Sequence, residues 1–210
     1  SNNYKIVKGS GVNLNNFKFY KYPKINNRIN FIMISRIINE KGVNVYLETA
    51  KYFKNLNKNF SFSLIGQKEN ELNLNRKVDL YSKNKIINYL GFLENIIPIM
   101  RNIHFVILPT MYNEGIPKSL IESAALGKPI ICSNQYGCNL IVKDKINGFI
   151  MNKVSKKNLI DTINTAVKKD FESLVKMGIA SNNIASNDFS VDHVNKSYLD
   201  YINLINENKE

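Results

Sequence analysis

The feature that most constrains the fold is the alternation of short, almost continuous apolar runs with segments of helical period. The apolar runs are rich in Ile, Phe and Val, which is typical of strands buried on both faces of a sheet. They span residues 29–35, 60–66, 86–90, 103–109 and 129–132. Because strands that alternate with helices are joined by βαβ crossovers, we predict an α/β fold: a Rossmann-like parallel sheet with helices on both faces.

The helical segments complete this alternation. Helical periodicity is clearest over 43–56, 120–126 and 159–167, and from residue 159 onward we expect helices only. The last predicted helix is amphipathic, and its apolar face consists of Val194, Tyr198, Tyr201, Ile202 and Ile205. We therefore predict a single domain over 1–210, with a leading segment at 1–28 and a closing helix at 190–210.

Composition excludes several classes of protein. The chain has 210 residues, a formal charge of +12 and 44% hydrophobic residues, which suits one globular domain with a real core. No run approaches the about 20 apolar residues that span a bilayer, and the start lacks a signal-peptide core, so we expect a cytoplasmic location. Cys132 and Cys138 have no second pair or neighbouring His, so we predict reduced thiols rather than a zinc site or a disulfide framework.

The positive charge leaves the partner open. It would suit nucleic acid, an anionic membrane or a phosphate-bearing ligand. However, the lysines are spread among Asn and Ile along the whole chain, and short pairs such as Lys156-Lys157 fall in helical segments, where a solvated face is the usual outcome. Charge alone therefore does not identify a partner.

Two cations follow the first predicted strand. Arg36 comes directly after it, and Lys41-Gly42 opens the next helix. In α/β folds ligands bind where strand carboxyl ends meet helix amino ends. A lysine at a helix amino end opposes the helix dipole unless an anion is bound, so a phosphate site is favoured here, although solvated surface charge explains the pair about as well when taken alone.

The most informative stretch runs from Pro109 to Pro129 and is typical of a strand, a glycine loop, a helix and a second strand. Gly115 allows backbone amides to approach a ligand, Pro117 suits the first helical turn, and Gly127 suits the helix stop. Such free amides bind anions.

Two carboxylates belong to the same stretch. Glu114 lies in the loop and Glu122 about two turns into the helix, so that both can face one cleft and accept hydrogen bonds from hydroxyl groups. Glu122 could be a solvated helical residue, yet its neighbours are Leu, Ile and Ala, and a buried acid needs a partner. Cations beside carboxylates suggest a ligand that carries both phosphate and sugar hydroxyls.

These motifs together resemble those of a known family. Arg36-x4-Lys41-Gly42, then Glu114-x7-Glu122 with Gly127-Lys128-Pro129, and then Gly137-Cys138 with Asn147-Gly148-Phe149, occur in order after a leading segment that begins at Lys5. The pattern, over about 5–167, is similar to the donor half of the retaining glycosyltransferase family 4, also called group 1, and is close to bacterial polysaccharide and lipid-linked oligosaccharide enzymes.

The resemblance implies a GT-B enzyme of which this is the C-terminal, donor-binding domain, with the N-terminal acceptor domain outside this sequence. It implies that Arg36 and Lys41 bind the diphosphate and that Glu122 holds the ribose. It further implies that Glu114 and the amides of Gly115, Ile116 and Pro117 contact the transferred sugar. The implied phosphate contacts are the amides of Ser119 and Leu120. The implied base contact is the 90–93 loop, with Gly91 and Leu93.

The implied reaction transfers a sugar, with retention of configuration, from a nucleotide-sugar to a saccharide or lipid-linked acceptor. UDP-sugar is the expected donor, and no metal or other cofactor is expected, since Arg and Lys neutralise the leaving diphosphate. Membrane attachment of the whole enzyme at the inner face of the plasma membrane would suit such a pathway. The alternatives are a related epimerase or phosphorylase, whose signatures we do not find, and a non-catalytic basic module that binds nucleic acid or anionic membrane.

The chain departs from the family pattern at two places. Gly137-Cys138-Asn139-Leu140 stands where relatives often read Gly-Cys-Arg-Glu, which removes a charged pair near the sugar, and Ser35 stands where Gly often precedes the Arg. His104 and His193 match no catalytic position, so we expect packed or surface histidines.

Overall fold

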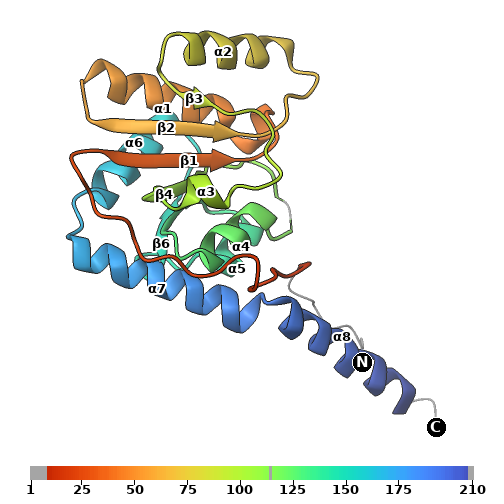
Figure 1. Ribbon diagram of the computed structural model, residues 1–210. Helices are drawn as coiled ribbons and strands as arrows, with labels where there is room; N and C mark the ends of the chain where they lie inside the picture. Colours follow the sequence, from red (N-terminus) through yellow and green to blue (C-terminus); the bar gives the residue numbers. More distant parts are fainter. Residues whose placement is uncertain (1–8, 114, 208–210) are drawn as a thin grey trace.

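The computed structural model describes residues 9–113 and 115–207, and its centre is a parallel sheet (Figure 1). Over the described residues the sheet has six strands in the order β3-β2-β1-β4-β5-β6. The strands are β1 (Ile29–Ile34), β2 (Phe60–Ile65), β3 (Asn88–Tyr89), β4 (Phe105–Leu108), β5 (Ile130–Ser133) and β6 (Gly148–Met151). The predicted Rossmann-like fold is therefore confirmed.

The direction in which strands are added reverses between β1 and β4. β2 pairs with β1 over its whole length, from Ile29 opposite Phe60 to Ile34 opposite Ile65. On the other side of β1, β4 begins the second half of the sheet, with Phe31 opposite Phe105. Such a reversal leaves a crevice at the strand carboxyl ends, because the loops on its two sides lead to opposite faces of the sheet.

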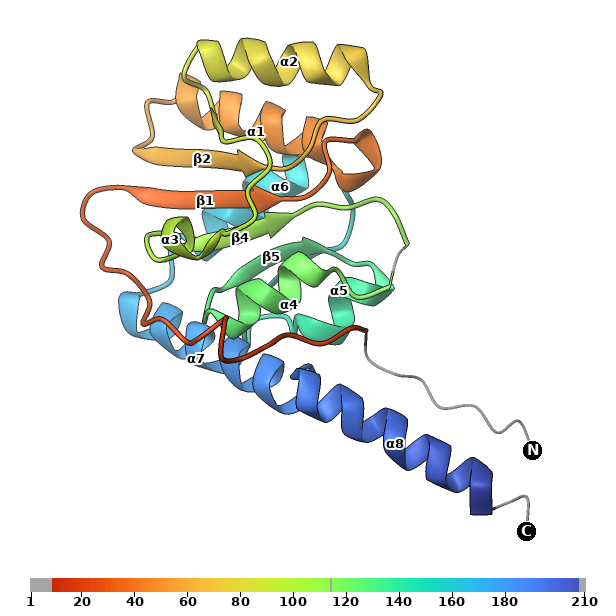
Figure 2. The same ribbon diagram turned by 45° about the vertical axis from the view of Figure 1, so that its right-hand side comes forward.

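Helices cover both faces of the sheet (Figures 1 and 2). α6 packs against α1 on one face, whereas α4 packs against α5 and α7 on the other. The helices are α1 (Val43–Asn55), α2 (Leu72–Lys83), α3 (Ile97–Met100), α4 (Lys118–Ala125), α5 (Tyr136–Ile141), α6 (Lys156–Ala166), α7 (Phe171–Asp188) and α8 (Val191–Glu207), with a 3₁₀ turn η1 (Asn39–Lys41) before α1.

The structure adds elements that the sequence patterns did not predict. β6 is a strand although its first residue is glycine, and Gly148 is needed there because a Cβ would lie 2.0 Å from the carbonyl oxygen of Ile130. β3 pairs over only two residues of the predicted 86–90 run. α2 escaped prediction because its sequence is rich in Asn and Lys, so that only three of its residues are buried.

Aromatic residues form the middle of the core. The Phe31 ring stacks on Phe62 at 4.9 Å and on Phe105 at 5.6 Å between ring centroids, which joins three neighbouring strands. Tyr46 from α1 is fully buried, and its hydroxyl donates to the Ser63 carbonyl oxygen at 2.7 Å. The strands whose carboxyl ends carry the loops described below are thus held by a tightly packed aromatic core.

The leading segment and the last helix meet at one end of the domain. The Val12 N–H donates to the Phe189 carbonyl oxygen at 2.8 Å, and the Val191 N–H donates to the Val12 carbonyl oxygen at 3.1 Å. The predicted closing helix is present as α8, which runs away from the rest of the domain (Figure 2). Consequently Val194 is buried, whereas Tyr198 and Ile202 are largely exposed.

None of the helices in 9–113 and 115–207 is long and apolar enough to cross a membrane.

Candidate functional site

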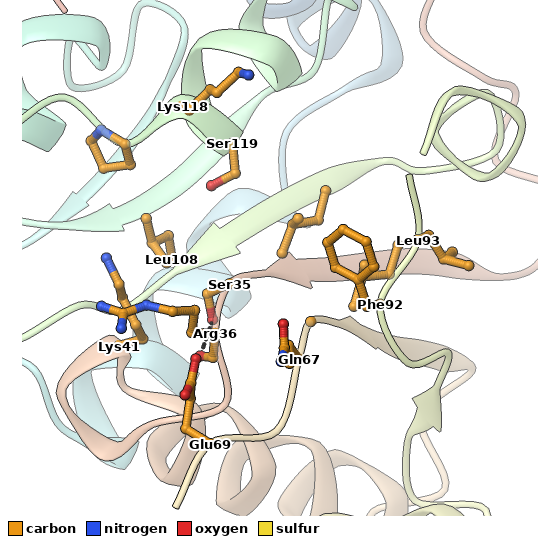
Figure 3. A pocket seen from close by; sticks show the side chains of 14 residues that line it. Ser35, Arg36, Lys41, Gln67, Glu69, Phe92, Leu93, Leu108, Lys118 and Ser119 are labelled. Atoms are coloured by element: carbon orange, nitrogen blue, oxygen red, sulfur yellow. Dashed lines mark hydrogen bonds between the residues drawn. The ribbon is translucent and has the colours of Figure 1, made fainter. Parts of the chain in front are cut away.

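A hollow of about 320 Å³ lies at the carboxyl ends of the strands (Figure 3). Its floor is apolar and consists of Ile34, Ile65 and Leu108, the last residues of β1, β2 and β4. The hollow therefore occupies the crevice where the strand order reverses, and its size is within the range of about 300–1,000 Å³ that is usual for small-molecule sites.

Two cations form one side of the hollow. Figure 3 shows Arg36 and Lys41 together there, as predicted from their positions after β1. Lys41 ends η1 and is 9% exposed, whereas Arg36 is exposed. The chain can turn so tightly here because Gly42 adopts φ +77°, and a Cβ at this position would lie 1.9 Å from the Pro109 carbonyl oxygen.

The loop that carries the cations is tied to its neighbours by hydrogen bonds. The Ile37 N–H donates to the Gln67 carbonyl oxygen at 2.8 Å, and the Asn39 N–H donates to Glu71 Oε1 at 3.0 Å. Asn39 Nδ2 donates to the other carboxylate oxygen of Glu71, so the Glu71 carboxylate binds both the backbone and the side-chain amide of Asn39. The cations are therefore held on a preorganised loop rather than on a loose one.

The amino end of α4 forms a second side of the hollow. Pro117 caps this helix in an extended conformation, and Lys118 and Ser119 line the hollow. The first N–H groups of an α-helix have no acceptor within the helix, so this wall offers backbone donors to an anion. The Leu120 N–H instead donates to the Pro117 carbonyl oxygen at 3.0 Å, and the Leu120 side chain belongs to the core.

Glu122 does not line the hollow, but it lies on α4 about one helical turn after Lys118 and Ser119, which do. Its side chain is 16% exposed, and the Lys118 Nζ lies 3.8 Å from its Oε1. Burial raises the pKa of the Glu122 carboxyl, an effect that the nearby Lys118 ammonium opposes. The carboxylate thus sits half-buried at the edge of the site with spare capacity to accept hydrogen bonds.

The side opposite the cations is formed by the loop after β3. Phe92 and Leu93 line the hollow there, and Phe92 is 67% exposed (Figure 3). Gly91, at φ +70°, accepts a hydrogen bond from the Gly66 N–H at 2.8 Å, which ties this loop to the end of β2. A large aromatic side chain left in water at the rim of a pocket is available to cover a flat ligand group.

The structure brings five of the eleven predicted site residues to the hollow. Arg36, Lys41, Pro117, Ser119 and Leu93 line the hollow. Gly91 directly precedes the lining residue Phe92, while Gly115 is exposed and Ile116 is half-buried outside the lining. Glu114, predicted to contact the sugar, lies outside the described residues.

Sequence reasoning missed Gln67 and Glu69, which line the hollow from the loop after β2. A signal that could have found them was available, since this loop follows a largely buried strand at the edge where parallel strands end. Phe92 belongs to the 90–93 loop that was predicted to line the base, and it lines the hollow.

The other candidate groups are structural. Over the described residues, no group of three or more His, Cys, Asp and Glu side chains could hold a metal ion. Cys132 and Cys138 are buried free thiols, as expected. His104 is 3% exposed, and its Nδ1 accepts from the Asn30 N–H at 3.0 Å, while His193 is exposed on α8, so both histidines are packed or at the surface, as expected.

The family model described as "Glycosyl transferases group 1" matches residues 15–183. The chain belongs to the group 1 glycosyltransferases. The site just described, with its cations and helix amino end, falls within the matched range.

Two curated relatives are named as transferases that act on sugars linked to undecaprenol diphosphate. One is the N,N'-diacetylbacillosaminyl-diphospho-undecaprenol alpha-1,3-N-acetylgalactosaminyltransferase of Campylobacter jejuni, 26% identical over 84% of this chain and 48% of the relative. The other is the UDP-Gal:alpha-D-GlcNAc-diphosphoundecaprenol alpha-1,3-galactosyltransferase of Escherichia coli, 29% identical over 82% of this chain and 46% of the relative. The chain thus spans about half the length of the curated relatives it matches.

Solved structures share the fold at low identity. Anabaena HepE in complex with UDP-glucose superposes with a TM-score of 0.80 at 18% identity, covering 95% of this chain and 57% of that one. A structure described as the C-terminal domain of a group 1 glycosyltransferase from Francisella tularensis is covered completely, over 86% of this chain, with a TM-score of 0.69 and 18% identity. These likenesses support the fold.

Proposed function

We propose that this chain is the nucleotide-sugar-binding domain of a retaining glycosyltransferase that uses a UDP-sugar in bacterial polysaccharide or glycan biosynthesis. The observation that carries the proposal is the hollow itself, in which two preorganised cations and a helix amino end face an exposed aromatic ring across an apolar floor. A nucleoside diphosphate has the matching parts, an anionic end and a flat base.

Each wall suits one part of such a ligand. Arg36 and Lys41, with the first amides of α4, suit the diphosphate, because cations and helix amino ends both stabilise anions. Glu122 suits the ribose hydroxyls, since a carboxylate accepts hydrogen bonds from them. The loop with Gly91 and Phe92 suits the base, which can pack against the exposed ring.

The same cations suit the chemical step. When the bond between the sugar and the diphosphate breaks, negative charge builds up on the leaving diphosphate, and fixed positive charge lowers the energy of that state. Arg36 and Lys41 supply this charge, so we propose a reaction that needs no metal ion and no other cofactor. We further propose that the acceptor, a saccharide or a lipid-linked sugar, binds to a second domain outside this sequence; the greater length of the relatives and the lipid-linked substrates in their names support this proposal.

The test is a titration of UDP, GDP and ADP, followed by UDP-sugars, monitored by ligand-observed NMR at moderate salt. We expect selective binding of UDP that Glu122→Ala weakens by about tenfold or more. Glu172→Ala is the matched control, because Glu172 forms a similar i,i+4 ion pair with Lys176 on α7.

Two results would contradict the proposal. One is the absence of binding by all three nucleotides. The other is binding of RNA or anionic vesicles that falls steeply with salt and survives Glu122→Ala, because it would favour a basic binding module instead.

In the intact enzyme, Arg36→Ala and Lys41→Ala should each lower turnover by orders of magnitude, which corresponds to about 2–4 kcal/mol of transition-state stabilisation. Near-normal turnover of both variants would refute the diphosphate assignment. The 210-residue chain by itself should show no transfer, because the proposed second domain is needed to hold the whole acceptor beside the anomeric carbon.

A further inference from the structure

A second hollow, of about 420 Å³, adjoins the first. Arg36, Lys41 and Glu69 line both, so the two hollows share a wall of charged side chains. The second hollow also has walls formed by Tyr112 and Glu40. A ligand that places its phosphates at the cations would therefore have this space directly beside its anionic end.

Tyr112 is held at the wall of the second hollow by polar contacts. The Lys41 Nζ lies 5.9 Å from the centre of its ring, within the range of a cation–π interaction. The Tyr112 N–H donates to Thr110 Oγ1 at 3.2 Å, and that hydroxyl donates to the Glu40 carbonyl oxygen at 3.2 Å. Although it is held in this way, Tyr112 remains 54% exposed, so its ring is available to a ligand.

We propose that the second hollow binds a pyranose ring, with Tyr112 as its aromatic platform. This inference rests on the proposed function and adds a sugar subsite to it. The C–H groups of a pyranose form an apolar patch that packs on an aromatic face, and its hydroxyls hydrogen-bond with carboxylate and amide groups. Glu40 and Asn70 supply such groups on the walls of the hollow.

The charges in the second hollow favour a neutral, hydroxyl-rich ligand over a further phosphate. Arg36 and Lys41 line it as well, but they are assigned to the diphosphate; the remaining charged residues are Glu40, Glu69 and Glu71, and carboxylates repel anions. Glu71 already binds Asn39 through both of its oxygens, so the acceptors facing a ligand are Glu40 and Glu69. The sugar could be the one attached to the nucleotide or the terminal sugar of the acceptor, since both present the same chemistry.

The experiment compares the wild-type chain with Tyr112→Ala. Tyr136→Ala is the matched control, because Tyr136 is 56% exposed on α5 and lines neither hollow. Dissociation constants are measured by NMR for UDP, UDP-galactose and UDP-N-acetylglucosamine, and for methyl α-galactoside and methyl α-N-acetylglucosaminide in the presence of UDP.

We expect Tyr112→Ala to lower the affinity for at least one sugar-containing ligand by about fivefold more than it lowers the affinity for UDP. Tyr136→Ala should change neither affinity. A selective loss of UDP-sugar affinity assigns the hollow to the donor sugar, and a selective loss of methyl glycoside affinity assigns it to the acceptor sugar. Equal effects on UDP and on every sugar ligand would overturn the subsite.

Failure of the subsite is distinguishable from failure of the proposed function. If the wild-type chain binds UDP and Tyr112→Ala has no selective effect on sugars, the subsite alone is wrong. If the wild-type chain binds no nucleotide but binds methyl glycosides through Tyr112, the sugar subsite stands and the nucleotide assignment is wrong.

Discussion

Replacing Lys128 with Met should stabilise this domain at neutral pH. Lys128 precedes β5 and is 0% exposed, and its Nζ has no hydrogen-bond partner among the described residues. A buried ammonium without a partner is costly, and burial accordingly lowers the pKa of Lys128 from its ordinary 10.5 to about 8. Met has a similar length and carries no charge, so Lys128→Met removes that cost without leaving a large cavity.

The size and the sign of the effect follow from the two pKa values. At about 1.36 kcal/mol per pKa unit, the difference between 10.5 and about 8 makes the charged Lys128 destabilising by about 3 kcal/mol. Below pH 8 the group is charged in both the folded and the unfolded chain, so the full cost is present at pH 7. Between pH 8 and 10.5 the folded chain releases the proton first, and the cost falls to below about 1 kcal/mol near pH 10.

The assay is urea unfolding followed by circular dichroism, with wild type and Lys128→Met compared at pH 7 and pH 10. At pH 7 the variant should be more stable by up to about 3 kcal/mol, which for a chain of this size raises Tm by roughly 6–12 °C. At pH 10 most of the difference should vanish. His104, whose pKa is lowered by burial and by the Lys128 charge, is neutral at both pH values, so the change with pH isolates Lys128.

Lys169→Met, at an exposed position, is the control, and it should change stability little at either pH. A variant less stable than wild type at pH 7 would refute the reasoning. So would a stabilisation of the same size at pH 7 and pH 10, because the benefit would then not come from the removed charge.

Three further predictions concern the site. Gly42→Ala should destabilise the domain by on the order of 3 kcal/mol in urea unfolding, because its Cβ would lie 1.9 Å from a carbonyl oxygen. Gly115→Ala should cost much less, because its Cβ would meet nothing within 4 Å, and equal costs would contradict this. Glu71→Ala should weaken UDP binding by about three- to tenfold with little loss of stability, because Asn39 loses its clamp; unchanged affinity would show that the clamp does not position the cations. Phe92→Ala should weaken UDP binding by about tenfold and Phe92→Tyr should not, as measured by the same NMR titration; equal affinities would remove Phe92 from the base site.

The sequence predicted the parts of the fold that depend on local pattern. Buried parallel strands need nearly continuous apolar runs, so the run at 29–35 identified β1 and that at 103–109 identified β4. Elements with few buried residues left no such pattern, and α2 was therefore missed. β6 was missed because its glycine is required by a close approach to β5, which is a tertiary contact.

For the site, the sequence by itself determined which chemical groups are present and in what order. The sequence showed a cation after the first strand, a second cation before a glycine, and a helix that begins near a proline. It also predicted that these groups lie together, because the carboxyl ends of parallel strands meet at one edge. Only the tertiary structure decided that Phe92 faces the cations across the hollow, that Glu71 grips Asn39, and that Tyr112 stands beside Lys41. These contacts join loops that are far apart in the chain, so their geometry depends on strand order and packing rather than on any local pattern.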